Sequence, residues 1–156
     1  MSKSLARVRA ALSAAGLDAE IREVGQARTA AEAAASVGCG VDQIAKSIIF
    51  RAEDSGRPVL FLTAGGNLVD DARASELAGT RLGRADAALI RAETGFAIGG
   101  VAPVGHLKPI RAWLDPRLLE FAQVWAAAGT PRHVVCLPSA GLAELTGATV
   151  ADFVQD

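Results

Sequence analysis

A glycine-rich segment, residues 95–106, carries the strongest chemical signal in the sequence. It reads GFAIGGVAPVGH, so three further glycines, a proline and one of the two histidines follow a short apolar run. We expect Gly99, Gly100 and Gly105 to permit positive φ and close approach of another molecule, while Pro103 stiffens the loop. We therefore predict that backbone N–H groups of residues 99–101 cradle a ligand or an oxyanion. A structural turn between two strands uses the same residue types and is the alternative.

Lys46 is the charged residue that we expect in the site. It lies in the string IAKSIIF, residues 44–50, where its neighbours are mostly apolar. Because a buried ammonium is costly, Lys46 must reach solvent, a partner or a ligand. Snorkelling to the surface from the start of a strand is the alternative.

The histidines and cysteines offer weaker candidates. His106 follows the loop and could act as a base, but no carboxylate that would orient it is visible, so an ordinary polar loop residue is the alternative. For His133 we expect a structural or exposed position, and a turn that faces the pocket is the alternative. Cys39 and Cys136 lie far apart without metal-ligand spacing, so we predict free thiols and no metal site. We expect Cys136 to be a buried small hydrophobe, and Cys39 has no adjacent base that would make it a nucleophile.

The order Gly99-x-x-x-Pro103 followed by Gly105 resembles the GxxxP loop of the YbaK and prolyl-tRNA synthetase-associated editing-domain family, whose members deacylate mischarged tRNA. Residues 42–50 are similar to the family segment in which a lysine stands at the start of a core strand. The likeness extends through residues 59–67, 84–86 and 124–131, and so covers nearly the whole chain.

The resemblance implies roles for individual residues. Backbone N–H groups near Gly99, Gly100 and Val101 would stabilise the oxyanion, and a ribose hydroxyl of the substrate would assist proton transfer. Lys46 would contact the ester carbonyl, the ribose or a phosphate of the terminal adenosine. The expected substrate-binding residues are Ala102, Pro103, Gly105, His106 and the turn residue Asn67.

The resulting functional prediction is a trans-editing hydrolase that deacylates mischarged aminoacyl-tRNA, with mischarged tRNA-Pro as the expected substrate. Its partners would be the acceptor end of the aminoacyl-tRNA and prolyl-tRNA synthetase, and we expect no cofactor. The alternative is a non-catalytic small-ligand or protein-interaction module on the same fold. The sequence leaves open which amino acid is removed and what the oligomeric state is.

Composition is compatible with this prediction. The 156 residues predict one domain, 1–156, with 51% hydrophobic and 21% charged residues. Apolar runs are too short to cross a bilayer, so we expect a cytoplasmic protein without a membrane partner. A net charge of −1 argues against sequence-independent nucleic-acid binding but permits contact with a tRNA end. A local basic patch could form from Arg81, Arg84, Arg91, Lys108 and Arg111.

The elements that position these residues are predicted from periodicity and capping. Apolar residues at helical spacing predict a helix over residues 5–15, and Thr29 with Glu32 forms a capping-box pattern that opens a helix ending at Gly38. Asp70 or Asp71 caps a helix through residue 78, and Asp86 caps another that ends at residue 95. A short helix begins at Pro116, and Ser139 is expected to cap a last helix through residue 145.

Strands are predicted between these helices. The runs 46–52 and 58–64 are joined by hairpin-turn residues and should form the antiparallel centre of a sheet. Further strand candidates are 19–24, 96–98, 110–114, 124–127 and 133–137. The order lacks strict βαβ alternation, so we predict an α+β (mixed α/β) fold with a mixed, largely antiparallel sheet surrounded by helices.

Overall fold

The computed structural model describes residues 2–25 and 27–156, so residues 1 and 26 of the predicted domain lie outside it. The helices are α1 (Lys3–Ala14), α2 (Ala30–Val37), α3 (Asp71–Ala78), α4 (Ala87–Thr94) and α5 (Leu142–Thr146), with short 3₁₀ helices η1 (Val41–Gln43) and η2 (Pro116–Glu120). The strands are β1 (Ile21–Glu23), β2 (Ile44–Ala52), β3 (Pro58–Ala64), β4 (Leu82–Arg84), β5 (Arg111–Leu114), β6 (Gln123–Ala127), β7 (His133–Pro138) and β8 (Thr149–Val150).

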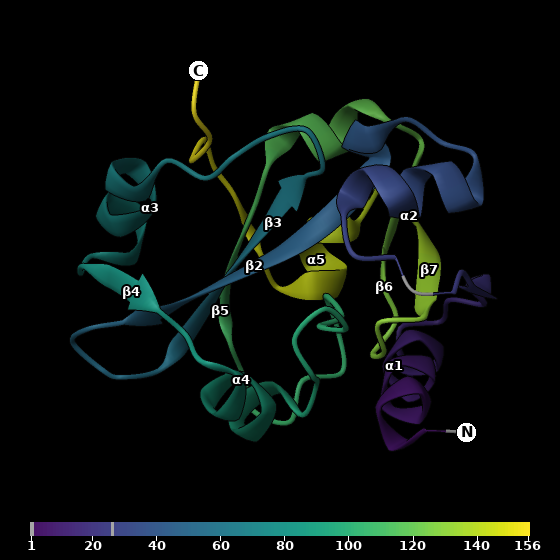
Figure 1. Cartoon of the computed structure of the whole chain (residues 1–156), viewed down its shortest axis with the longest axis horizontal. Coiled ribbons are helices and arrows are strands. Elements are labelled where there is room, and N and C mark those ends of the chain that lie inside the picture. The colour runs from purple at the N-terminus through teal and green to yellow at the C-terminus, as the bar shows by residue number, and fades with distance from the viewer. Residues whose placement is uncertain (1, 26) are drawn as a thin grey trace.

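One mixed sheet organises the described chain, in the order β1-β7-β6-β2-β3-β5-β8, with β4 paired to β2. The β2–β3 hairpin lies at its centre, running diagonally through Figure 1, and pairs Ala45 with Ala64 and Arg51 with Pro58. The pairs β1–β7, β6–β7 and β2–β4 are also antiparallel, while β2–β6, β3–β5 and β5–β8 are parallel. The predicted fold class and central hairpin are confirmed.

The sheet has an apolar core on each face because successive strand residues point to opposite sides. Leu60 and Leu62 pack in a large cluster with side chains of α1, α4 and α5. Val59 and Phe61 pack in a second cluster with α3, where Phe61 stacks on Trp113 with ring centroids 4.9 Å apart. A third cluster lies under α2. Every residue of β3 is therefore buried.

The capping residues in the sequence predicted most helix ends correctly. Thr29, Asp70 and Asp86 each accept a hydrogen bond from the backbone N–H three residues later, at Glu32, Arg73 and Leu89. Gly38 ends α2 in the left-handed conformation.

Two local predictions are wrong. Residues 96–98 form no strand: the chain turns there, and the buried Phe96 anchors the turn in the core. Ser139 does not cap α5, which starts at Leu142 after Gly141; its hydroxyl instead donates to the carbonyl of Phe121. No helix among the described residues has the length and apolar character that a membrane crossing requires.

Candidate functional site

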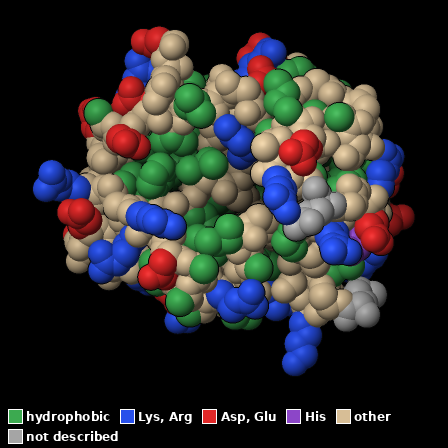
Figure 2. All heavy atoms as spheres, viewed as in Figure 1, with side chains coloured by type: hydrophobic (Ala, Val, Ile, Leu, Met, Phe, Trp, Pro, Cys, Tyr) green, Lys and Arg blue, Asp and Glu red, His purple; other side chains and the backbone are tan. Residues whose placement is uncertain are grey.

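A cavity of about 810 Å³ opens beside the start of β2. Its walls are α2 and the segments at residues 98–101 and 130–134, and its floor is formed by β2 and β6. Most lining residues are apolar, including several alanines of α2, Ile44, Ile48, Val101 and Trp125. Figure 2 shows this face hollowed near its centre, with apolar side chains in and beside the hollow and Lys and Arg side chains along its edge. This is the usual form of a small-molecule site, with an apolar wall and few polar groups.

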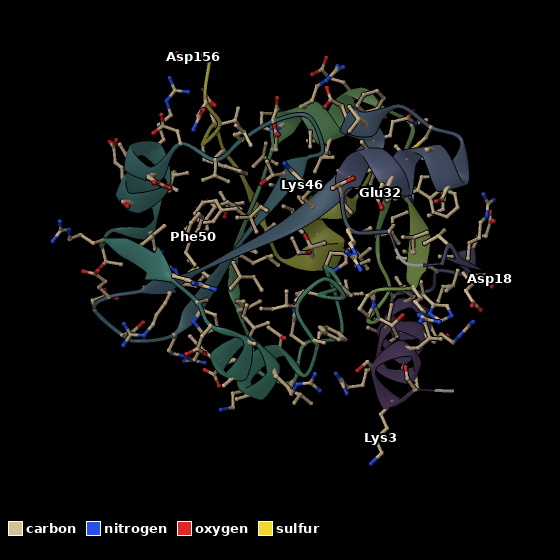
Figure 3. All side chains as sticks on the ribbon, in the orientation of Figure 1. Lys3, Asp18, Glu32, Lys46, Phe50 and Asp156 are labelled. Carbon is tan, nitrogen blue, oxygen red and sulfur yellow. The ribbon has the colours of Figure 1, made fainter. Side chains whose placement is uncertain are left out.

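Lys46, for which the family resemblance implied a site role, lines this cavity. It is the third residue of β2, opposite Thr63 of β3, and its Nζ donates to the carbonyl oxygen of Asn67 at 2.6 Å. Figure 3 places it on β2 beside α2, the helix that carries Glu32. Burial lowers the pKa of Lys46, while the carboxylates of Asp115 and Asp42 oppose that shift. The ammonium is therefore held at the edge of an apolar cavity.

A buried carboxylate that the sequence analysis missed holds the lysine's partner. Asp115 is 1% exposed, and its Oδ2 accepts from the side-chain amide of Asn67 at 2.9 Å and from the N–H of Ala64 at 3.1 Å. Its Oδ1 accepts from the N–H of Arg117 at 2.9 Å. The Asp115-Pro116 pair, an N-cap followed by proline at the first helical position, was the available signal.

A second carboxylate, Asp42, holds the turn residue before Asn67. Asp42 accepts from the N–H of Gly66 at 2.8 Å and from the Nε of Arg117 at 3.0 Å. Asn67, which the sequence analysis named as substrate-binding, does not line the cavity itself, and its backbone carbonyl instead accepts from Lys46.

The glycine-rich loop reaches the same cavity at residues 98, 99 and 101. Gly100 N–H donates to the carbonyl of Ala97 at 3.0 Å, and Gly99 has a φ of +86°, the geometry of a type II turn. Val101 is 5% exposed, and its carbonyl accepts from the Ser47 hydroxyl at 2.7 Å. Within residues 2–25 and 27–156, the N–H groups of Gly99 and Val101 donate to no protein acceptor. The loop therefore keeps two donors at the cavity.

The role expected for Gly100 needs correction. Its φ is not positive, and its N–H is occupied within the turn. The absence of a side chain is needed for packing, because a Cβ there would lie 2.8 Å from Cα and the carbonyl carbon of Thr130.

The remaining loop residues lie elsewhere. Ala102 is fully buried and lines neither this cavity nor the next. Pro103, Gly105 and His106 line a second hollow of about 740 Å³, beside α1 and α5. The structure thus separates these four expected substrate-binding residues from Lys46.

His106 makes a structural contact. Its Nε2–H donates to the carbonyl of Ala102 at 2.7 Å, and its ring meets Phe96 edge-on with centroids 5.8 Å apart. Burial lowers the pKa of His106, and the charge of Arg7 lowers it further, while the bond to Ala102 opposes the shift. His133, by contrast, lines the cavity, with its Nδ1 2.7 Å from the hydroxyl of Thr130.

Neither cysteine lines the cavity. Cys39 and Cys136 are free and half-buried beside the cluster under α2, and burial raises the pKa of both thiols. Cys136 is thus less buried than predicted. None of the five basic residues that could form a local patch lines the cavity, whose lining cations are Lys46 and Arg28, and Lys108 pairs with Glu93 at 2.6 Å.

Known proteins resemble this chain over most of its length. A family model of the aminoacyl-tRNA editing domain matches residues 24–145. The uncharacterized protein YwhH of Bacillus subtilis (strain 168) is 29% identical over 118 residues, which cover 76% of this chain and 74% of that protein.

Two crystal structures share the fold. A proposed trans-editing enzyme for prolyl-tRNA synthetase is 44% identical with a TM-score of 0.92, and the match covers 100% of this chain and 99% of that one. The hypothetical protein APE2540 is 29% identical with a TM-score of 0.86, covering 96% and 99%. The predicted family resemblance is confirmed.

Proposed function

We propose, because this chain belongs to the aminoacyl-tRNA editing domain family, that it hydrolyses the ester bond of mischarged aminoacyl-tRNA in trans. In this proposal residues 1–156 act as a single editing domain, and mischarged tRNA-Pro is the substrate. The relation to prolyl-tRNA synthetase rests on the proposed activity of the 44% identical relative. The observation that carries the proposal is the placement of Lys46 and of the Gly99 and Val101 N–H groups around one apolar cavity.

The proposed reaction matches these groups to an aminoacyl ester. A water oxygen adds to the carbonyl carbon and the ester C–O bond breaks. One proton of the water goes to the ribose oxygen, the other is released to solvent, and the amino acid leaves as its carboxylate. Negative charge develops on the carbonyl oxygen, where preorganised N–H donors such as those of Gly99 and Val101 stabilise it; one such donor is worth roughly 10²–10³ in rate in other enzymes. The N–H of Gly100 has no part, because Ala97 accepts it.

Lys46 supplies the positive charge in this scheme. Its ammonium contacts the ester carbonyl, the ribose or a terminal phosphate, and the carbonyl of Asn67 limits where it points. The apolar wall formed by α2 and Trp125 receives the amino-acid side chain. No protein nucleophile is required, since water is the attacking group.

The test is a deacylation panel with tRNA-Pro charged separately with alanine, cysteine, serine and threonine. We expect turnover of at least one of these, and a loss of at least about tenfold in Lys46→Ala, equivalent to about 1.4 kcal/mol of transition-state stabilisation. Lys3→Ala is the matched control, since Lys3 is exposed on α1.

Two results would contradict the proposal. Saturable binding of charged tRNA without turnover of any substrate would favour the non-catalytic binding module. Turnover by Lys46→Ala at the wild-type rate would remove the lysine from the mechanism.

A further inference from the structure

Arg7 of α1 contacts both ends of the glycine-rich loop. Its Nη2 donates to the carbonyl of Gly95 at 2.6 Å, and its Nε donates to the carbonyl of Gly105 at 3.3 Å. The guanidinium carbon lies 4.9 Å from the ring centroid of Phe96. Figure 1 shows the segment after α4 lying between α4 and α1, so the helix is placed to hold it.

The two end residues are shaped for this contact. Gly95 and Gly105 have φ values of +80° and +82°. A Cβ at Gly95 would collide with Arg7 Nη2, and one at Gly105 would lie 3.1 Å from the carbonyl oxygen of Arg7. The close approach of α1 therefore requires glycine at both ends of the loop.

Arg7 directs its donors to backbone carbonyls rather than to a carboxylate. Within the described chain it has no acidic partner within salt-bridge distance. The fork of a guanidinium can bind two separate acceptors at once, whereas a lysine ammonium presents a single point charge.

Between the two clamped ends, other side chains hold the loop at its carbonyl oxygens. Ser47 donates to Val101 at 2.7 Å, and His106 donates to Ala102 at 2.7 Å. These bonds occupy loop acceptors and leave the N–H groups of Gly99 and Val101 without protein partners among the described residues.

The C-terminal end of the loop is also tied to α4, because the N–H groups of Leu107 and Lys108 donate to the carbonyls of Thr94 and Glu93, each at 3.1 Å. From α1, the Ser4 hydroxyl joins Arg7 on the Gly95 carbonyl at 3.3 Å, and among the described residues Arg7 alone contacts both ends of the loop by side-chain hydrogen bonds.

We propose that Arg7 is a positioning residue for the deacylation reaction, which holds residues 95–105 so that the Gly99 and Val101 donors stay preorganised. The proposal rests on the proposed function. Arg7 acts through the loop backbone and lines no part of the cavity. Loss of the clamp lowers transition-state stabilisation while the apolar walls that bind the substrate remain in place.

The test compares Arg7→Met, which keeps much of the aliphatic stem but no donors, with Arg9→Met on the exposed face of the same helix. For Arg7→Met we expect kcat to fall at least about tenfold with KM within about twofold, because a misplaced donor affects the transition state. Backbone amide exchange in residues 96–104 should accelerate in the same variant. Arg9→Met should match wild type in both measurements.

The kcat and the amide exchange rates of Arg7→Lys should lie between those of wild type and of Arg7→Met. If Arg7→Met does not fold, Arg7→Lys is the variant that tests the proposal. Wild-type kcat in the Arg7 variants overturns the proposal even if loop exchange accelerates. A lowered kcat with unchanged exchange in residues 96–104 overturns it too, because Arg7 would then act by another route. Amide exchange needs no substrate, so failure of the proposed function appears separately, as absence of turnover by the wild-type protein.

Discussion

Replacement of Gly100 by alanine tests whether the glycine-rich loop is held by packing. Gly100 is buried, and an added Cβ would lie 2.8 Å from Cα and the carbonyl carbon of Thr130 and 3.0 Å from its nitrogen. These are backbone atoms, so relief requires the loop or the β6–β7 connection to move. Overpacking of this kind destabilises by about 1–3 kcal/mol.

The expected loss of thermal stability follows from this destabilisation. In a chain of 156 residues, each kcal/mol lowers the thermal midpoint by about 2–4 °C, so Gly100→Ala should lower it by about 2–12 °C. The displaced loop also carries the Gly99 and Val101 donors away from their positions. Since a misplacement of about 1 Å can reduce a rate roughly 10²-fold, we expect at least about a tenfold loss of kcat.

Gly40→Ala is the matched control. Gly40 has a φ of −72°, and a Cβ there would meet only the Gln43 side chain, at an ordinary 3.6 Å. Thermal unfolding by circular dichroism and single-turnover deacylation below both midpoints give the two measurements. A wild-type midpoint for Gly100→Ala would refute the collision, and a lowered midpoint with a wild-type rate would refute the link between loop position and chemistry.

Three further predictions use other parts of the chain. Gly99→Ala and Gly79→Ala should each lower the free energy of unfolding by about 1–2 kcal/mol, because both glycines have positive φ (+86° and +75°) and neither added Cβ would meet an atom closer than 3.9 Å, but only Gly99→Ala should slow deacylation. Burial lowers the pKa of His106, so the unfolded chain takes up the proton first; wild-type stability should fall as pH drops below about 6.5 and through the folded pKa, and a non-titrating His106→Gln should lose this dependence in thermal melts. Initial rates should be unchanged by a chelator and, at matched folded concentration, by serine at Cys39 and Cys136; abolished turnover in either case would mean that the proposed chemistry is wrong.

Local sequence chemistry predicted the parts of the fold that depend on near neighbours. The caps at Thr29, Asp70 and Asp86 act over three residues, and the β2–β3 hairpin spans a short turn. Strand β4 was missed because its three residues gain strand geometry only by pairing with Phe50–Ala52. Residues 96–98 have a strand-like composition but no neighbouring strand to pair with, so the turn prevails.

The residues proposed for the site came from local patterns together with the family resemblance. An ammonium in an apolar strand needs solvent, a partner or a ligand, and the resemblance turned Lys46 into a site residue, whereas Asn67 was chosen because it follows a glycine turn. That Asp115 links Asn67 to the end of β3 depends on a separation of 48 residues, which no local pattern reports.

The glycines of the loop show most clearly what the sequence alone does not predict. From sequence alone, Gly99, Gly100 and Gly105 look alike, and display of backbone to a ligand explains all three, while Gly95 is expected only to end a helix. The structure gives them different tasks: Gly99 bends the turn at the cavity, Gly100 packs against the β6–β7 connection, and Gly95 and Gly105 make room for Arg7. The surfaces that distinguish them lie up to 98 residues away, at Arg7. A glycine-rich loop thus predicts close approach, but only the fold decides whether the approaching group is a ligand or the protein itself.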